Sequence, residues 1–387
     1  MTNKLKAFDF VLPTKIRFGF GVSAELEKEI KNMGKNTILI ITDKGLTRAG
    51  VVTKVVEKLS EDLITNLIIF DEVQPNPRDT IVHSAYEIAK SQGADVLVAI
   101  GGGSSMDVAK AVSILLTSGG VISDYEGLDQ VKKEPTPIIA IPTTVGTGSE
   151  VTFWSVITDT NRHFKMSIGS IMIAPKVALV DPNLVMSLPP DVIASTGMDA
   201  LTHAIEGYTC KLAEPITDAC GIYAIKYIAD NIKNAVYTDD SESKAKMLLG
   251  SLIAGICFGN SDIAAVHAMA EALGGLYDTP HGIANAIMLP HVMKYNYVSS
   301  TKKYAEIANA MGEDLFNLSE KAAAFKAVEA VEKLNRDLKI PSLKDIGANP
   351  DDFEELSLRS EMNVSTSSNP REISKNEFLE IFQRAYE

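Results

Sequence analysis

Cysteine is scarce in this sequence, which contains three cysteines among 387 residues. Cys210, Cys220 and Cys257 form neither a CxxC pair nor an even set, so a disulfide framework is not expected. Each of the three lies in an apolar helical pattern. We therefore expect all three to be reduced residues of the core.

Long apolar runs are also missing. The uncharged run 247–261 is too short and too rich in glycine to cross a bilayer, and residues 1–9 contain no apolar segment of the kind found in signal peptides. Basic residues are in deficit, because the formal net charge is -13 at pH 7, which opposes binding to a phosphate backbone. These absences predict a soluble, cytoplasmic protein with neither a nucleic-acid nor a membrane partner.

The length of the chain exceeds what one hydrophobic core usually fills, so two domains are expected. We place them at residues 1–188 and 189–387, because the Leu-Pro-Pro at 188–190 changes the pattern. In the first domain short apolar strands alternate with helices, which is typical of an α/β fold whose parallel sheet is covered on both faces. Segments 151–158 and 164–168 are expected to form a hairpin joined to that sheet. The second domain has helical periodicity almost throughout and is predicted to be all-α.

The expected strands of the first domain are 37–42, 66–70, 95–100 and 137–141, and its expected helices are 51–61, 80–92 and 105–116. The expected helices of the second domain include 194–210, 217–235, 241–258, 263–277 and 322–338.

A triple glycine, 101–103, follows an expected strand and opens an expected helix. Such a turn leaves backbone amides free at a helix N-terminus and predicts phosphate binding, although a tight connection without a ligand has the same pattern. It departs from the G-x-G-x-x-G fingerprint. Because a second loop of small polar residues, 142–149, follows the next strand, we interpret the pair as the pyrophosphate site of a dinucleotide.

Asp43 stands at the end of an early expected strand. In a dinucleotide-binding sheet a carboxylate at this place accepts from the adenosine ribose and repels a 2′-phosphate, which favours NAD over NADP. The same residue is equally suited to capping the helix that follows. Both interpretations stay open.

Histidine is rare as well, yet four of the six histidines lie between 203 and 291. Asp199 and His203 are four residues apart, so one helix face presents both side chains. A lone histidine in an apolar helix is usually a core residue, but His267 and His281 complete a set of one oxygen and three nitrogen ligands. That set suits Zn(II) or Fe(II) far better than Mg(II) or Ca(II). We therefore predict a metal site.

Several motifs together resemble the iron-containing, metal-dependent alcohol dehydrogenases, which are related in fold to glycerol dehydrogenase and dehydroquinate synthase. They are GGGSSMD at 101–107, PTTVGTGSE at 142–150, GMDALTHAIE at 197–206, VH at 266–267, PHG at 280–282 and NAIMLPH at 285–291. The resemblance covers nearly the whole chain. It implies NAD(H)-dependent and Fe(II)-dependent interconversion of a short primary alcohol or diol and its aldehyde, with Zn(II) as the other metal. It also implies a homodimer or a larger homo-oligomer.

The resemblance also assigns site residues. It implies that the metal ligands are Asp199, His203, His267 and His281. The residues that it places along the NAD site are Asp43, Asn76, Gly102, Gly103, Ser104, Asp107, Thr143, Thr144, Thr147 and Lys165. Those that it places around the substrate are Phe153, Trp154 and Phe258, although Trp154, the single tryptophan, is equally suited to covering the hairpin as an aromatic plug.

One position departs from the family. Many members carry a histidine four residues after the third metal ligand, where this chain has Glu271. A glutamate at that spacing faces the same cleft, where it could relay a proton, bind a substrate hydroxyl or belong to a structural network. Glu206, three residues past His203, is a candidate for orienting a metal-bound histidine. His291 is a candidate for a place behind the ligands, whereas His83 and His163 are expected in a surface helix and in the hairpin turn.

Two other functions compete with this one. A lyase or cyclase of the dehydroquinate synthase kind needs cationic side chains for a phosphorylated substrate, but residues 254–290 contain neither lysine nor arginine. The apolar surroundings of Phe258 suit a short neutral alcohol better. A non-catalytic sensor of NAD and metal would lose ligands that this chain keeps.

Overall fold

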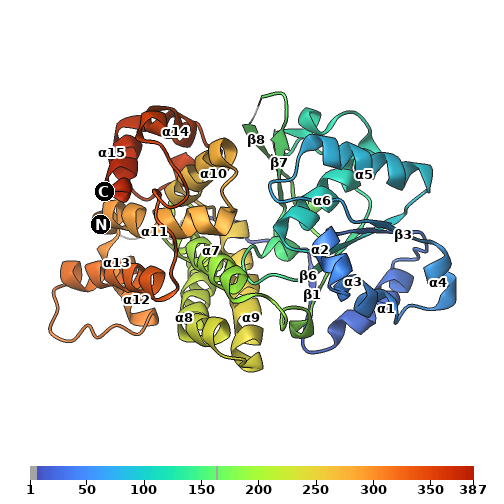
Figure 1. Ribbon diagram of the computed structural model, residues 1–387, viewed down its shortest axis with the longest axis horizontal. Helices are drawn as coiled ribbons and strands as arrows, with labels where there is room; N and C mark the ends of the chain where they lie inside the picture. Colours follow the sequence, from blue (N-terminus) through green and yellow to red (C-terminus); the bar gives the residue numbers. More distant parts are fainter. Residues whose placement is uncertain (1–6, 163) are drawn as a thin grey trace.

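The structure is a computed structural model that describes residues 7–162 and 164–387. The chain divides into a half built on a parallel sheet, blue to green in Figure 1, and a helical half, yellow-green to red. The predicted α/β and all-helical architectures are both confirmed. His163 lies outside the described residues.

The large sheet has six parallel strands in the order β1-β9-β6-β4-β2-β3. The bounds are β1 (Lys15–Phe18), β2 (Ile38–Ile41), β3 (Leu67–Phe70), β4 (Val96–Gly101), β6 (Ile138–Pro142) and β9 (Val177–Val180). Every residue of β2, β4, β6 and β9 is buried, as expected for strands with helices on both faces. The four predicted strands are confirmed, and β1 and β9 are additional.

Six helices flank these strands: α1 (Leu26–Asn32), α2 (Lys44–Arg48), α3 (Val51–Val56), α4 (Glu61–Thr65), α5 (Asp79–Ser91) and α6 (Gly103–Ser118). The helix predicted over 51–61 is confirmed only as far as residue 56, because the chain turns between α3 and α4. The Ser60 amide donates to the Glu27 carboxylate of α1 at 2.7 Å. This long-range bond replaces the helical hydrogen bond that the local pattern would favour.

The predicted hairpin is confirmed as β7 (Trp154–Asp159) and β8 (Phe164–Gly169), but its attachment to the large sheet was wrong. With the short strand β5 (Gly127–Leu128) it forms a separate sheet in the order β5-β8-β7. Ser155 Oγ donates to the Asp107 carbonyl at 2.9 Å, so β7 packs on α6 instead of pairing with a strand of the large sheet. In Figure 1 the hairpin stands at the top, between the two halves.

The helical half surrounds one large hydrophobic core. Its helices are α7 (Pro190–Thr209), α8 (Pro215–Tyr237), α9 (Ser241–Asn260), α10 (Ala265–Tyr277), α11 (His281–Asn296), α12 (Thr301–Ala310), α13 (Glu320–Asp337), α14 (Phe353–Glu361) and α15 (Lys375–Tyr386). In the described part of the chain no single helix combines the length and the apolar composition that a membrane crossing needs, although the bent pair α9 and α10 meets both tests together.

All three cysteines are free. Cys210 and Cys257 are buried as expected, whereas Cys220 is only partly buried, so its assignment to the core was wrong. Residue 220 lies on the side of α8 that is partly exposed to solvent, and an apolar periodicity alone does not tell how closely neighbours cover a position.

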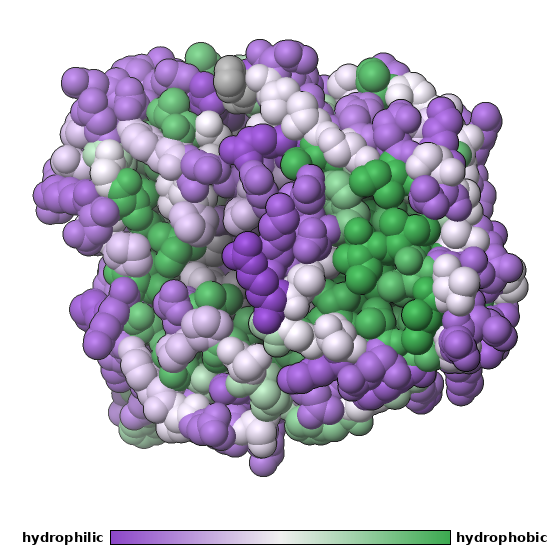
Figure 2. Space-filling view, turned by 45° about the vertical axis from the view of Figure 1, so that its right-hand side comes forward, coloured by the Kyte–Doolittle hydropathy of each residue, from purple (hydrophilic) through white to green (hydrophobic). Residues whose placement is uncertain are grey.

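Figure 2 shows a broad hydrophobic area on the right of the molecular face, on the α/β half.

The sheet order places a topological switch point between β2 and β4. The chain leaves β2 toward the edge strand β3 and leaves β4 in the opposite direction, toward β6. In open α/β sheets the crevice beyond the carboxyl ends of such strands is the usual ligand site. Here that crevice is bordered by Asp43, after β2, and by the glycine turn after β4.

Candidate functional site

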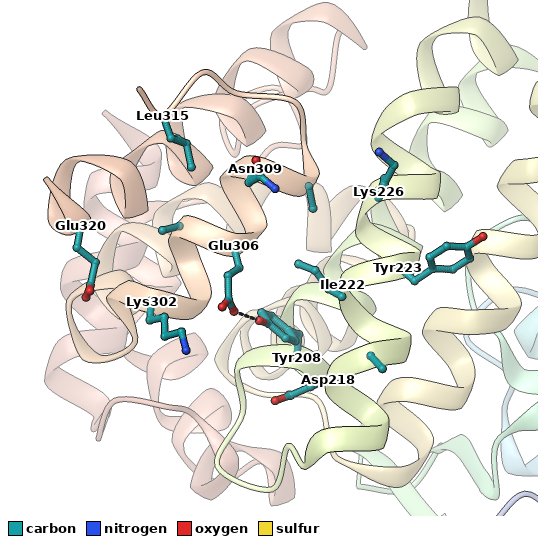
Figure 3. A pocket seen from close by; sticks show the side chains of 13 residues that line it. Tyr208, Asp218, Ile222, Tyr223, Lys226, Lys302, Glu306, Asn309, Leu315 and Glu320 are labelled. Carbon is teal, nitrogen blue, oxygen red and sulfur yellow. Dashed lines mark hydrogen bonds between the residues drawn. The ribbon is translucent and has the colours of Figure 1, made fainter. Parts of the chain in front are cut away.

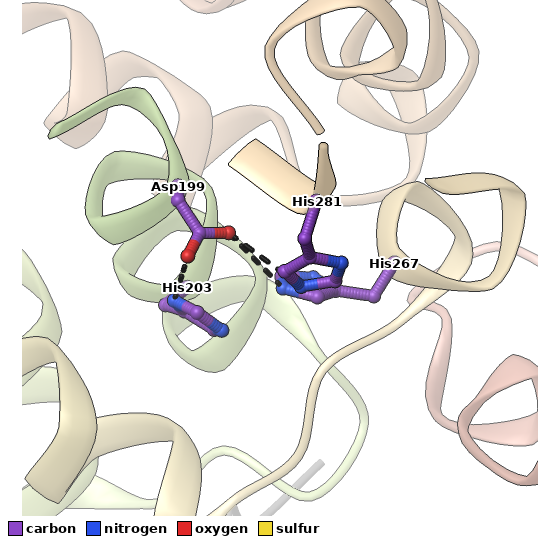
Figure 4. A group of neighbouring side chains, drawn as sticks. All are labelled: Asp199, His203, His267 and His281. Carbon is purple, nitrogen blue, oxygen red and sulfur yellow. Dashed lines mark ion pairs between the residues drawn. The ribbon is translucent and has the colours of Figure 1, made fainter. Parts of the chain in front are cut away.

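Four side chains of the helical half converge on one point, as Figure 4 shows. The ligand atoms of Asp199, His203, His267 and His281 all lie within 4.8 Å of one another. Asp199 and His203 stand one turn apart on α7, His267 is on α10, and His281 opens α11. The distances from the Asp199 carboxylate to the nearest nitrogens of the three histidines are 3.9, 4.0 and 3.7 Å, in chain order. The geometry therefore joins the residues that the sequence analysis grouped.

The chemistry of this cluster fits a divalent transition metal. His203 Nδ1 and His267 Nε2 are buried ring nitrogens without a hydrogen-bond partner in the described structure. Burial lowers the pKa of His267 well below its usual range and that of His281 to about 3, so both rings are neutral and keep a lone pair for a metal. Neutral imidazoles with one carboxylate suit Fe(II) or Zn(II). Without an ion, these nitrogens would carry the cost of burial with no compensating bond.

The ligands are themselves held in place. Glu206 Oε2 lies 2.6 Å from His267 Nδ1, so this carboxylate orients the His267 ring. The two residues are 61 positions apart in the sequence, whereas His203 is only three residues from Glu206. Glu206 also accepts from the backbone amides of Ala264 at 3.0 Å and Val266 at 2.7 Å, at the start of α10. Burial raises the pKa of Glu206 to about 7, and these amides act in the opposite direction. Asn285 Nδ2 donates to Asp199 Oδ1 at 2.7 Å.

The expected aromatic neighbours have different positions. Phe258 on α9 stacks on the His203 ring with centroids 4.2 Å apart and planes 15° apart. Trp154 faces Gly169 across the hairpin, where a Cβ would lie 2.5 Å from the indole ring. The tryptophan thus covers the hairpin as the plug interpretation predicts, while Phe258 stands directly beside the metal cluster.

Two polar loops meet at the carboxyl ends of β4 and β6. Thr143 N donates to the Gly101 carbonyl at 3.0 Å. A Cβ on Gly102 would lie 3.0 Å from Thr144 Cγ2, and one on Gly103 would lie 2.9 Å from Thr147 Cγ2. Helix α6 begins at Gly103, so its first amides lack intrahelical partners and carry the positive end of the helix dipole. This close contact makes a backbone cradle for an anion.

Asp43 caps α2, because its Oδ1 accepts from Leu46 N at 3.0 Å. The capping interpretation is therefore confirmed, and the ribose contact stays a prediction. Ser104 follows Gly103 in the first turn of α6, where its amide belongs to the cradle.

A fully buried lysine, which the sequence analysis missed, lies below this cradle. Lys110 Nζ donates to Ser149 O at 2.9 Å, Thr152 Oγ1 at 3.1 Å and Trp154 O at 2.8 Å. Burial lowers its pKa to about 8 and raises the pKa of nearby Asp107 to about 6. A lysine in an otherwise apolar helix, three residues after Asp107, was the available signal. Lys110 fixes the segment that leads from the second loop to the hairpin.

Asn76 and Lys165 lie on the α/β side of the same region. Lys165 Nζ donates to Asn76 Oδ1 at 2.8 Å, and Asn76 Nδ2 donates to Asp278 Oδ1 at 2.7 Å. Asp278 ends α10 in the helical half. The structure thus brings the two expected residues together, although 89 residues separate them in the chain.

Glu271, at the position that departs from the family, accepts from Asn363 Nδ2 at 2.6 Å through Oε2. Burial raises its pKa, and the charge of Lys165 acts in the opposite direction. The network interpretation is therefore seen in the structure, whereas a proton relay and a substrate contact stay predictions. Among the described residues, no hydrogen bond or ring contact links His291 to the four ligands, so its place behind them is not supported.

A different pocket lies between α8 and α12 and has a volume of about 720 Å³ (Figure 3). Tyr208 OH donates to the Glu306 carboxylate on its wall. The pocket shares no lining residue with the metal cluster or the glycine cradle. Its size alone therefore does not identify it as the reaction site.

Two family models together match most of the chain. Iron-containing alcohol dehydrogenase matches residues 13–182, and the C-terminal part of the Fe-containing alcohol dehydrogenase family matches residues 193–386. The chain belongs to the iron-containing alcohol dehydrogenase family. The family is thus confirmed, and with it the resemblance on which the site assignments depend.

Individual relatives agree with this membership. A 1,3-propanediol dehydrogenase of Citrobacter freundii is 40% identical over 385 residues, which cover 98% of this chain and 99% of the relative. The crystal structure of a 1,3-propanediol oxidoreductase matches with a TM-score of 0.95 and 39% identity, over 98% of this chain and 100% of that chain. Sulfoacetaldehyde reductase from Bifidobacterium kashiwanohense, solved in complex with NAD+, matches with a TM-score of 0.88 and 31% identity, over 98% and 99% of the two chains.

Proposed function

We propose that this chain is an NAD(H)-dependent and iron-dependent alcohol dehydrogenase, which interconverts a short primary alcohol or diol and its aldehyde by hydride transfer. The observation that carries the proposal is the convergence of Asp199, His203, His267 and His281, whose ligand atoms lie within 4.8 Å of one another in a family of iron-containing alcohol dehydrogenases. Relatives named for propanediol and for an aldehyde agree with substrates of this size.

Each half of the chain supplies one part of the reaction. Fe(II) held by the four ligands would supply Lewis-acid chemistry to the alcohol or aldehyde oxygen. Glu206 would keep the His267 ring turned toward a bound metal, and Phe258 would exclude water beside His203. The glycine cradle and the α6 amides would hold the pyrophosphate of NAD, and the partly exposed edge of the cluster at His281 leaves room for the substrate.

The cofactor-binding residues that we propose are Asp43, Asn76, Gly102, Gly103, Ser104, Asp107, Thr143, Thr144, Thr147 and Lys165. The substrate contacts that we propose are Phe153, Trp154, Phe258 and Glu271. We further propose that residues 1–188 and 189–387 are separate domains, that the protein forms a homodimer or larger homo-oligomer, and that it acts in the cytoplasm without nucleic-acid or membrane partners.

The metal requirement gives the first test. Protein stripped with a chelator and reconstituted anaerobically with Fe(II) should oxidise NADH in the presence of short aldehydes, whereas stripped protein should not. A parallel reconstitution with Zn(II) decides between the two metals. His281→Ala should lose metal and turnover, while His83→Ala, a control histidine on α5, should keep both. Turnover by stripped protein with no residual metal would refute the proposal.

Two alternatives give different results in the same assay. A lyase or cyclase would consume a phosphorylated substrate without net oxidation of NADH. A sensor would bind NADH and metal at full occupancy and show no turnover. The absence of lysine and arginine from residues 254–290 and the complete ligand set favour the dehydrogenase.

A further inference from the structure

One amide side chain connects the two halves of the chain beside the proposed site. Asn76 donates to Asp278 Oδ1 at 2.7 Å and accepts from Lys165 Nζ at 2.8 Å. Arg78 Nη2 flanks the same carboxylate at 4.0 Å. We call these four residues the clasp. Asp278 belongs to the helical half, and the other three belong to the α/β half.

Both sides of the clasp are anchored in secondary structure. Thr158 N donates to the Pro77 carbonyl at 2.8 Å, which ties the loop of Asn76 to β7. Asp278 ends α10 in a left-handed conformation with φ 53°, three residues before His281. A Cβ on Gly274 would lie 3.0 Å from Lys165 Nζ, so the lysine lies directly against α10. A movement of the α/β half would therefore reach the loop that carries a proposed metal ligand.

The clasp is buried at one end and open to water at the other. Burial lowers the pKa of Lys165, while the carboxylates of Glu271, Asp107 and Asp278 act in the opposite direction. The side chain of Asp278 is 68% exposed. The inner end is thus held by charges from both halves, whereas the outer hydrogen bond can exchange with water when the halves separate.

We propose that Asp278 is a positioning residue. Through Asn76 and Lys165 it holds the α/β half against α10, which keeps the nicotinamide end of a bound dinucleotide facing the metal side of the site. This inference rests on the proposed function, because Asn76 and Lys165 are proposed cofactor-binding residues and Asp278 is not. Loss of the clasp loosens the cofactor and slows hydride transfer, but leaves the metal ligands in place.

The variant Asp278→Gly removes the carboxylate and tolerates the left-handed backbone. We expect its Kd for NADH to rise by about fivefold, a typical effect of one hydrogen bond to a charged group at a partly exposed site, and kcat to fall as well. NADH binding is measured through energy transfer from Trp154, the single tryptophan, and NADH release by stopped flow. Asp345→Asn, which removes an exposed carboxylate bonded to Ser342 within the helical half, is the control.

A reversal of the hydrogen bond separates the clasp from a direct cofactor contact. Asn76→Asp opposes two carboxylates and should raise the Kd for NADH by about tenfold or more. In the double variant Asn76→Asp with Asp278→Asn, the amide at 278 donates to the carboxylate at 76, and the Kd should return to within about threefold of the wild-type value. No recovery in the double variant would overturn the inference, because the loss would then belong to Asn76 alone.

Three further results decide the case. If Asp278→Gly binds NADH like the wild type, the clasp has no role. If Asp278→Gly loses iron, Asp278 supports the loop before His281 and does not act by holding the α/β half against α10, which also overturns the inference. If the wild type itself fails to bind NADH, the proposed function fails, and this is visible before any variant is compared.

Discussion

Replacement of Glu206 tests how the metal cluster is supported. This carboxylate accepts hydrogen bonds from the His267 ring at 2.6 Å and from the backbone amides of Ala264 and Val266 at 3.0 and 2.7 Å. Its side chain is 4% exposed, so water cannot replace it. Glu206→Ala removes the acceptor of these three groups and of the His267 amide, which donates at 3.4 Å. At about 1–3 kcal/mol for each closely bonded donor, we expect a loss of about 3–5 kcal/mol in the free energy of unfolding of metal-free protein.

Glu206→Gln separates the two roles of this residue. The amide keeps an oxygen that can accept from the start of α10, so the loss of stability should be about 1–2 kcal/mol. The His267 ring loses its ionic acceptor, and loss of such a partner of a metal ligand typically weakens metal binding by about 10–100-fold, or about 1.4–2.7 kcal/mol. The expected losses in metal affinity and in stability are therefore of similar size, so each must be measured separately.

Two assays measure these effects independently of turnover. Urea unfolding of metal-free protein reports the capping role, and competition for Fe(II) or Zn(II) with a chromogenic chelator reports the orientation of His267. Glu306→Gln, at a carboxylate bonded to Tyr208 and outside the candidate ligand set, is the matched control. An affinity of Glu206→Gln within about twofold of the wild type, or an equal loss in Glu306→Gln, would refute the reasoning.

Three other predictions concern single residues. Gly103→Val should raise the Kd for NADH by about tenfold or more, because a Cβ there lies 2.9 Å from Thr147 Cγ2; fluorescence titration measures it, and an unchanged Kd would move the nucleotide elsewhere. Lys110→Met should cost about 3 kcal/mol in urea unfolding, since it leaves buried partners unpaired; a loss below about 1 kcal/mol would contradict its anchoring role. Burial lowers the pKa of His291 from 6.5 to about 4. The unfolded chain therefore binds a proton at a higher pH than the folded chain does, and the free energy of unfolding falls as the pH drops from about 6.5 to 4. By pH 4.5, metal-free His291→Gln should have lost about 2 kcal/mol less of this free energy than the wild type, and equal losses would refute this.

The sequence was most informative where chemistry and local periodicity coincide. Asp199 and His203 share one helix face, so their spacing alone placed two candidate ligands together, and the strand-to-glycine pattern located the start of α6 to within two residues. The capping role of Asp43 also follows from the residues beside it. In each case the determining interaction spans four residues or fewer, and a pattern of neighbours can record it.

Long-range partners could not be predicted in this way. Glu206 was a candidate for orienting a metal-bound histidine, but the sequence did not say which one. It contacts His267, which is distant in the sequence and near only because α7 and α10 meet. The Asn76–Asp278 bond spans 202 residues. The turn between α3 and α4 likewise contains a bond from Ser60 to Glu27, and the hairpin packs on α6. No local pattern contains these partners, because tertiary packing chooses them.

A backbone contact that leaves no room for a side chain fixes the position of the glycine cradle relative to the candidate metal ligands. Gly148 lies near the end of the second loop of the cradle, and a Cβ there would lie 2.6 Å from Gly255 Cα on α9. Three residues further along α9, Phe258 stacks on His203. A continuous path of packed atoms therefore runs from the proposed pyrophosphate site to a proposed metal ligand, with Lys110 fixing the segment after Gly148. Hydride transfer needs donor and acceptor held at a set separation, and this path supplies it on the inner side of the site while the clasp closes the outer side.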